Sequence, residues 1–125
     1  MLREIRNVHQ VPGEPRRRWF FSHEQDLLVW FGPDGRPVAF QLAYAKHRDE
    51  RAIRWKAGQG FAHHRVDDGE SASLWKEAPL LYPDGAFDAT GVLEQFLALS
   101  RELPPFVVEF VSARLREHPD YREGA

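Results

Sequence analysis

The chain of 125 residues contains no cysteine, which excludes disulfides, thiolate metal sites and thiol nucleophiles. No apolar run reaches the roughly 18 residues of a membrane-spanning helix, and the N-terminal MLREIRN lacks the hydrophobic region of a signal peptide. Phosphate-binding glycine loops, nucleophile elbows and HExxH zinc motifs are also missing. We therefore expect a cytoplasmic protein with no membrane contact, no cofactor and no metal.

The length fits a single domain over residues 1–125, which can bury a hydrophobic core without the help of disulfide bonds. The charge is unevenly distributed along it. Residues 1–65 hold 12 Lys and Arg against 7 Asp and Glu, whereas residues 66–125 hold 5 against 12. Such an asymmetry fits either an anion-binding face or two halves of one fold that attract each other.

The first half of the chain has the period-two pattern of β-strands. It is clearest in PVAFQLAYA at 37–45, which the turn GPDGR joins to the strand DLLVWF at 26–31. The other expected strands are 16–22, 51–57 and 61–66, and residues 4–11 alternate only weakly.

The second half changes to helical spacing. Residues 87–103 are the first expected helix, with Asp88 as N-cap, and Pro104-Pro105 ends it and begins a second helix. Residues 74–82 fit a short helix or a strand, and HPDYREGA at the end is expected to fray. The order predicts an α+β fold, an antiparallel β-meander of about five strands followed by two C-terminal helices packed on one sheet face.

The registers of the two hairpins decide which side chains share a face. A Pro-Asp-Gly turn places Trp30 opposite Val38, and a two-residue Gly58-Gln59 loop places Arg54 opposite His63. The core face then gathers Leu28, Trp30, Val38, Phe40, Leu42, Tyr44, Ile53, Trp55, His64 and Val66. The second face gathers Leu27, Val29, Ala39, Gln41, Ala43, Arg54, Lys56, Phe61, His63 and Arg65.

The stretch GFAHHRVDDGE at 60–70 suggests a metal site or an acid–base site. In a regular strand His63 and His64 point to opposite faces, so they cannot both bind one metal. His63 with Asp67 as its orienting carboxylate would form a minimal acid–base pair, although Asp67 fits a turn as well.

The second face combines apolar side chains with convergent donors, and this mixture suits several functions. The leading hypothesis is a non-enzymatic binding or interaction domain, with a homodimer as one form of contact. One alternative is a small acid–base enzyme with His63 and an Arg54/Arg65 clamp on an anionic substrate, and another is weak RNA binding, which the pI of about 6.3 disfavours. A third is that the chain's own segments cover this face. The candidate ligand-binding residues are Gln41, Arg54, His63 and Arg65.

The segments RRRWFF, DLLVWF, VAFQLAY, ERAIRW and HHRVDDGE form a pattern along the chain. With it the chain resembles a set of small bacterial proteins of unassigned function that share RRWF…DLxVW…FQLxY…ERAxxW…H…VDDGE. The resemblance implies a bacterial single-domain protein. It carries no catalytic residue and no ligand over to this sequence.

Overall fold

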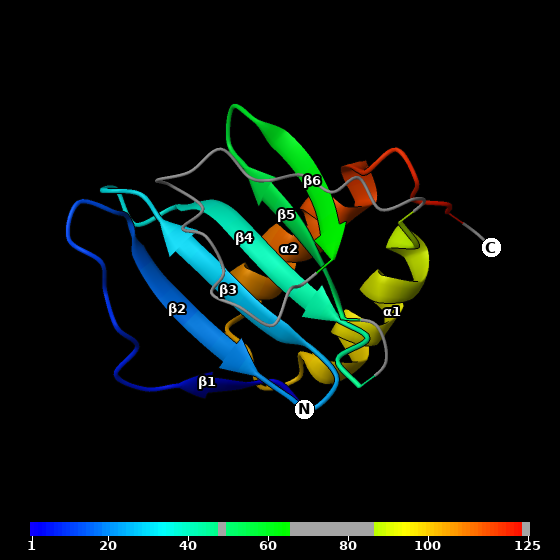
Figure 1. The fold of residues 1–125 in the computed structure, drawn as a ribbon, viewed down its shortest axis with the longest axis horizontal. Helices are drawn as coiled ribbons and strands as arrows, with labels where there is room; N and C mark the ends of the chain where they lie inside the picture. Colours follow the sequence, from blue (N-terminus) through cyan, green and yellow to red (C-terminus); the bar gives the residue numbers. More distant parts are fainter. Residues whose placement is uncertain (48–49, 66–86, 124–125) are drawn as a thin grey trace.

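The computed structural model describes residues 1–47, 50–65 and 87–123, with the backbone alone for His64 and Arg65. The predicted α+β arrangement is confirmed, with six strands where about five were expected (Figure 1). The strands are β1 (Arg3–Ile5), β2 (Arg16–Phe21), β3 (Asp26–Phe31), β4 (Pro37–Tyr44), β5 (Arg51–Lys56) and β6 (Gly60–Arg65). The helices are α1 (Ala89–Leu99) and α2 (Pro105–Glu117).

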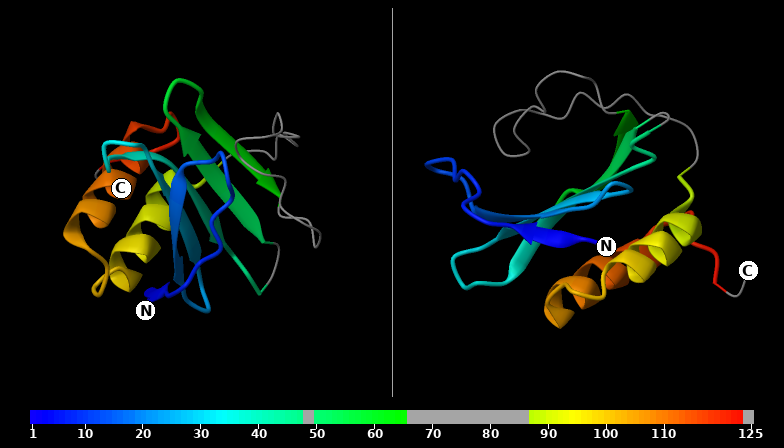
Figure 2. Two further views of the ribbon diagram at one scale, coloured as in Figure 1. Left: turned by 90° about the vertical axis from the view of Figure 1, so that its left-hand side faces the viewer. Right: turned by 90° about the horizontal axis from the view of Figure 1, so that it is seen from below.

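The sheet is an antiparallel meander in which every strand pairs with its neighbours in sequence, in the order β1-β2-β3-β4-β5-β6. Both helices lie against the same side of the sheet (Figure 2). Fully buried side chains from alternate positions of β2 to β5 meet those of the helices in one core. They include Phe20, Leu27, Val29, Phe40, Leu42 and Ile53 from the sheet and Phe96, Val107, Val111 and Leu115 from the helices.

The predicted register of the first hairpin is wrong by one residue. Trp30 pairs with Ala39 and not with Val38, because the pairing shifts at a bulge between Trp30 and Phe31. A one-residue slip moves every side chain of a strand to the other face. Leu27 and Val29 therefore lie in the helix-covered core, whereas Leu28, Trp30 and Val38 pack with Ala39 in a separate small cluster.

The predicted register of the second hairpin is also wrong by one residue. The loop has three residues, Ala57 to Gln59, because Lys56 pairs with Gly60. Gly58 and Gly60 have φ angles of 83° and 79°, which only glycine adopts without strain. His63 is consequently opposite Ile53 and not opposite Arg54, so it lies on the helix-covered face.

The ends of the elements follow from local chemistry. The first strand is shorter than the weakly alternating stretch 4–11, since Asn7 takes a φ of 59° soon after Ile5. The predicted N-cap is confirmed, because the Asp88 carboxylate accepts from the Gly91 amide at 3.0 Å. The second helix begins at Pro105, as predicted.

Candidate functional site

The binding cluster predicted from the sequence does not form on one face. Gln41 and Arg54 meet on the face away from the helices, where Arg54 Nε donates to Gln41 Oε1 at 2.7 Å. His63 lies on the opposite face, so its grouping with these two residues is wrong. The side chain of Arg65 and the whole of Asp67 lie outside the described residues.

The face that carries Gln41 and Arg54 is largely buried within the single chain. Arg54 is 6% exposed, and Trp30, Ala39 and Ala52 are also buried. This burial lowers the pKa of the Arg54 guanidinium below its ordinary value, because a charge is costly to remove from water. An open contact surface would need these side chains accessible.

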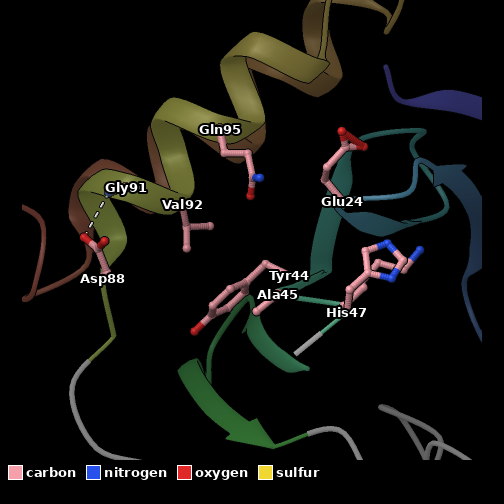
Figure 3. Close-up of a pocket in the computed structure, with 9 residues that line it drawn as sticks. Glu24, Tyr44, Ala45, His47, Asp88, Gly91, Val92 and Gln95 are labelled. Carbon is pink, nitrogen blue, oxygen red and sulfur yellow. Dashed lines mark hydrogen bonds between the residues drawn. The ribbon is translucent and has the colours of Figure 1, made fainter. Parts of the chain in front are cut away.

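A cleft of about 520 Å³ opens between the end of β4 and the first turns of α1 (Figure 3). Its volume falls within the range of small-molecule pockets. Three segments supply its walls, namely the turn between β2 and β3, the end of β4 with the residues that follow it, and one side of α1. The lining consists of Glu24, Tyr44, Ala45, Lys46, His47, Asp88, Gly91, Val92 and Gln95.

The wall after β4 is fixed by an unusual backbone turn. Ala45 has a φ of 56°, a left-handed conformation that is strained for a residue with a Cβ. Lys46, the next residue of this wall, donates from Nζ to Ser22 O at 2.7 Å and to Asp26 Oδ1 at 3.1 Å. Burial raises the pKa of Asp26 above its ordinary value, and the bond to Lys46 partly offsets this. The ammonium of Lys46 is thus already neutralised by a protein carboxylate.

The α1 wall is held in place by hydrogen bonds to the sheet. Gln25, which is fully buried, donates from Nε2 to Gln95 Oε1 at 3.0 Å and to Val92 O at 3.4 Å. Asp88 at the other end of this wall is tied to the Gly91 amide. These contacts position an amide and a carboxylate along one side of the cleft.

Tyr44 connects the cleft to a group of aromatic and titratable side chains behind it. Its hydroxyl is hydrogen-bonded to His63 Nε2 on β6. His63 and His118 both contact the ring of Phe87, with centroid distances of 5.0 Å and 4.8 Å. His118 Nδ1 accepts from the Asp120 amide at 3.0 Å, and Asp120 Oδ2 accepts from the Phe87 amide at 3.1 Å.

Burial perturbs three titratable groups in this region. It raises the pKa of Tyr44 to about 12. It lowers the pKa of His63 below its ordinary value, and the positive charge of Arg51 lowers it further. It also lowers the pKa of His118, an effect that Asp120 partly offsets. Both imidazoles are therefore neutral near pH 7.

The described part of the chain contains no group of three or more His, Asp or Glu side chains placed to hold a metal ion. Neither of its helices is long and apolar enough to cross a membrane.

The sequence analysis did not single out the residues that line this cleft. Tyr44 and Asp88 were assigned only to the core and to helix capping, and His118 and Asp120 to a fraying tail. The expectation of fraying is wrong for residues 118–122, because the Arg122 amide donates to Thr90 Oγ1 at 2.8 Å and Asp120 binds the Phe87 amide. Asp88, predicted as the N-cap of the first helix, was the sequence signal that lay next to the cleft.

Comparison of the chain with protein-family models, with curated proteins and with solved structures gave no match.

Proposed function

We propose that the chain is a non-enzymatic binding domain that holds a small organic molecule in the cleft between β4 and α1. The observation that carries this proposal is the cleft itself, in which three segments place polar and apolar groups around one space of about 520 Å³. The strained Ala45 supports it, since backbone strain persists where the surrounding structure requires a particular arrangement.

The charges around the cleft favour a cationic ligand. Glu24 and Asp88 contribute carboxylates from different walls, whereas Lys46 is neutralised by Asp26. The ring of Tyr44 and the side chain of Val92 add apolar surface between them (Figure 3). A compact amine with a hydrophobic body matches these groups. The anionic ligand expected from the sequence relied on Arg54 and Arg65, and neither lines the cleft.

A thermal-shift experiment with three analogues tests the proposal. Phenethylamine, phenethyl alcohol and hydrocinnamate share one ring and differ in charge. A ligand that binds only the folded state raises the unfolding midpoint as its concentration passes the Kd. We expect the amine to stabilise the wild type more than the alcohol, and the carboxylate least.

Two matched variants locate the binding. Gln95→Trp fills the cleft, whereas Glu94→Trp places the same side chain on the neighbouring exposed position of α1, outside the lining. The shift should persist in Glu94→Trp and disappear in Gln95→Trp. If hydrocinnamate gives the largest shift and Gln95→Trp still abolishes it, the ligand binds in the cleft, but the proposal that this ligand is a cation is wrong. No shift with any analogue, or an equal shift in both variants, would contradict the cleft.

Single-charge variants test the role of each carboxylate. Glu24→Gln and Asp88→Asn keep the shapes of the side chains, and asparagine can still cap the helix. For exposed ion pairs we expect each substitution to weaken binding of phenethylamine by about threefold. Binding of phenethyl alcohol should stay unchanged.

A second candidate function, acid–base catalysis at His63, has one specific observation in its favour. The imidazole is bonded to the Tyr44 hydroxyl, has a buried Nδ1 with no partner among the described residues, and has a pKa that burial lowers. Turnover of an activated ester such as p-nitrophenyl acetate tests it. A rate that follows the titration of His63, and that vanishes in His63→Gln but not in His9→Gln, would support this function over simple binding.

A homodimer and weak RNA binding stay open as further proposals. Light scattering after size-exclusion chromatography tests the dimer. Fluorescence anisotropy with a labelled single-stranded RNA at increasing salt tests the RNA, since phosphate contacts weaken steeply with salt.

A further inference from the structure

The residues after α2 hold the start of α1 against the sheet through a group that we call the histidine latch, composed of His63, Phe87, His118 and Asp120. Phe87 directly precedes α1, and His118 is the C-cap of α2. His63 comes from β6. Three elements that are distant in sequence therefore meet at one point.

Aromatic contacts form the first part of the latch. The ring of Phe87 contacts His118 at 4.8 Å and His63 at 5.0 Å between centroids, and His118 also contacts Phe61 of β6 at 4.8 Å. Phe87 is 3% exposed, so these contacts are inside the protein. An imidazole packed against rings in this way is stable as the neutral form and costly as the cation.

Hydrogen bonds form the second part, and they require His118 to be unprotonated at Nδ1. That nitrogen accepts from the Asp120 amide, which an imidazolium cannot do because both of its nitrogens carry protons. The same aspartate accepts the Phe87 amide through Oδ2. Protonation of His118 thus opposes the backbone turn that presents Asp120 to the start of α1.

The charged groups around the two imidazoles act in both directions, because Asp120 favours protonation of both histidines whereas Arg51 opposes protonation of His63. Arg51 on β5 and His118 itself oppose a positive charge on His63, and Asp120 is the carboxylate that favours it. Tyr44 on β4 is bonded to His63 Nε2 and stays a neutral phenol. Asp88 at the start of α1 acts on Tyr44 and not directly on either imidazole.

We propose that the histidine latch is an acid-sensitive switch, closed when His63 and His118 are neutral and opened when both are protonated. Opening releases the end of α2 and the start of α1 from β6. Because Tyr44 lines the cleft and Asp88 caps α1, opening also alters two walls of the cleft. The switch does not depend on the proposed ligand, since it acts on the fold itself.

The direction of the pH dependence follows from the pKa values, which are lowered in the folded state for both histidines. Between the folded and unfolded pKa values, the unfolded chain binds more protons than the folded one. The stabilisation is therefore complete above the ordinary histidine pKa of 6.5 and is lost as the pH falls towards the folded-state values.

NMR on the intact chain tests the switch. Imidazole resonances of His63 and His118 should titrate below the ordinary histidine value of 6.5. Over the same pH interval, corrected hydrogen-exchange protection of the Phe87 and Asp120 amides should be lost. Protection of amides in the centre of β4 should be retained.

Uncharged mimics separate the switch from general acid unfolding. His63→Gln retains an acceptor for the Tyr44 hydroxyl, and His118→Asn retains an acceptor for the Asp120 amide. The double variant should keep its protection at Phe87 down to the pH where carboxylates titrate, and His9→Gln should behave as the wild type. Histidines that titrate at or above pH 6.5, or equal loss of protection in wild type and the double variant, would overturn the proposal. If the double variant does not fold, the wild-type titration and His118→Asn alone decide the matter by the same criteria.

Discussion

Replacing Gly91 by alanine should have opposite consequences in two backgrounds, because Gly91 and Asp88 compete for one space. Gly91 is the third residue of α1, and its amide donates to the Asp88 carboxylate at 3.0 Å. A Cβ at position 91 would lie 2.9 Å from Asp88 Cγ, which is closer than such atoms approach. The Asp88 side chain must therefore leave its capping position in Gly91→Ala.

The magnitudes follow from two opposing contributions. Alanine stabilises a helix by roughly 0.5–1 kcal/mol relative to glycine. Loss of an N-cap costs about 1 kcal/mol. In the wild type the two should nearly cancel, whereas in Asp88→Ala the cap is already absent and Gly91→Ala should stabilise by the full helix contribution. The coupling in the double-mutant cycle is then about 1 kcal/mol.

Urea unfolding monitored by tryptophan fluorescence measures all four proteins, since the chain contains four tryptophans. The free energies are compared through the midpoints at a common slope. Asp88→Asn, which can still cap, is the control and should resemble the wild type. An equal gain from Gly91→Ala in both backgrounds would refute the reasoning, because it would mean that the aspartate does not hold the amide.

Three other substitutions test the fold and the cleft. Ala45→Gly removes a backbone strain of roughly 1–2 kcal/mol in the left-handed region, and it costs roughly 0.5–1 kcal/mol of chain entropy. Urea unfolding should therefore show a net gain in stability of about 0.5 kcal/mol. Ala45→Val should lose stability. Arg54→Met leaves the half-buried partner Gln41 without its donor and should cost about 1–3 kcal/mol, part of which Arg54→Met/Gln41→Leu recovers; a larger loss in the double variant would contradict the pairing. Leu42→Ala, at a fully buried position of β4, should cost about 2–5 kcal/mol by calorimetry, and a cost near zero would place β4 outside the core.

The fold class was accessible from the sequence because alternation and helical spacing are local properties. Residues 37–45 predicted β4 almost to its ends, and Asp88 and Pro105 predicted where the helices begin. A side chain that alternates, caps or restricts φ acts on its immediate neighbours, so its effect can be inferred without the rest of the chain.

The faces of the sheet were not accessible in the same way. Each hairpin register depends on the conformation of a short turn, where a bulge at Trp30 or a third loop residue changes the pairing by one. An error of one residue in the register is small along the chain. It nevertheless assigns every side chain of the strand to the wrong face of the sheet, because successive side chains point to opposite faces. It moved His63 away from Gln41 and Arg54 and onto the helix-covered face, where it is bonded to Tyr44.

The sequence by itself determined the order of strands and helices, the caps that begin the helices, and the exclusion of thiol and disulfide chemistry. The tertiary structure alone decided which of those side chains meet. The cleft joins a turn, a strand end and a helix, and the histidine latch joins β6 to residues more than fifty positions later. Such contacts depend on the packing of α1 and α2 against the sheet, and no local pattern in the sequence encodes that packing distance or angle.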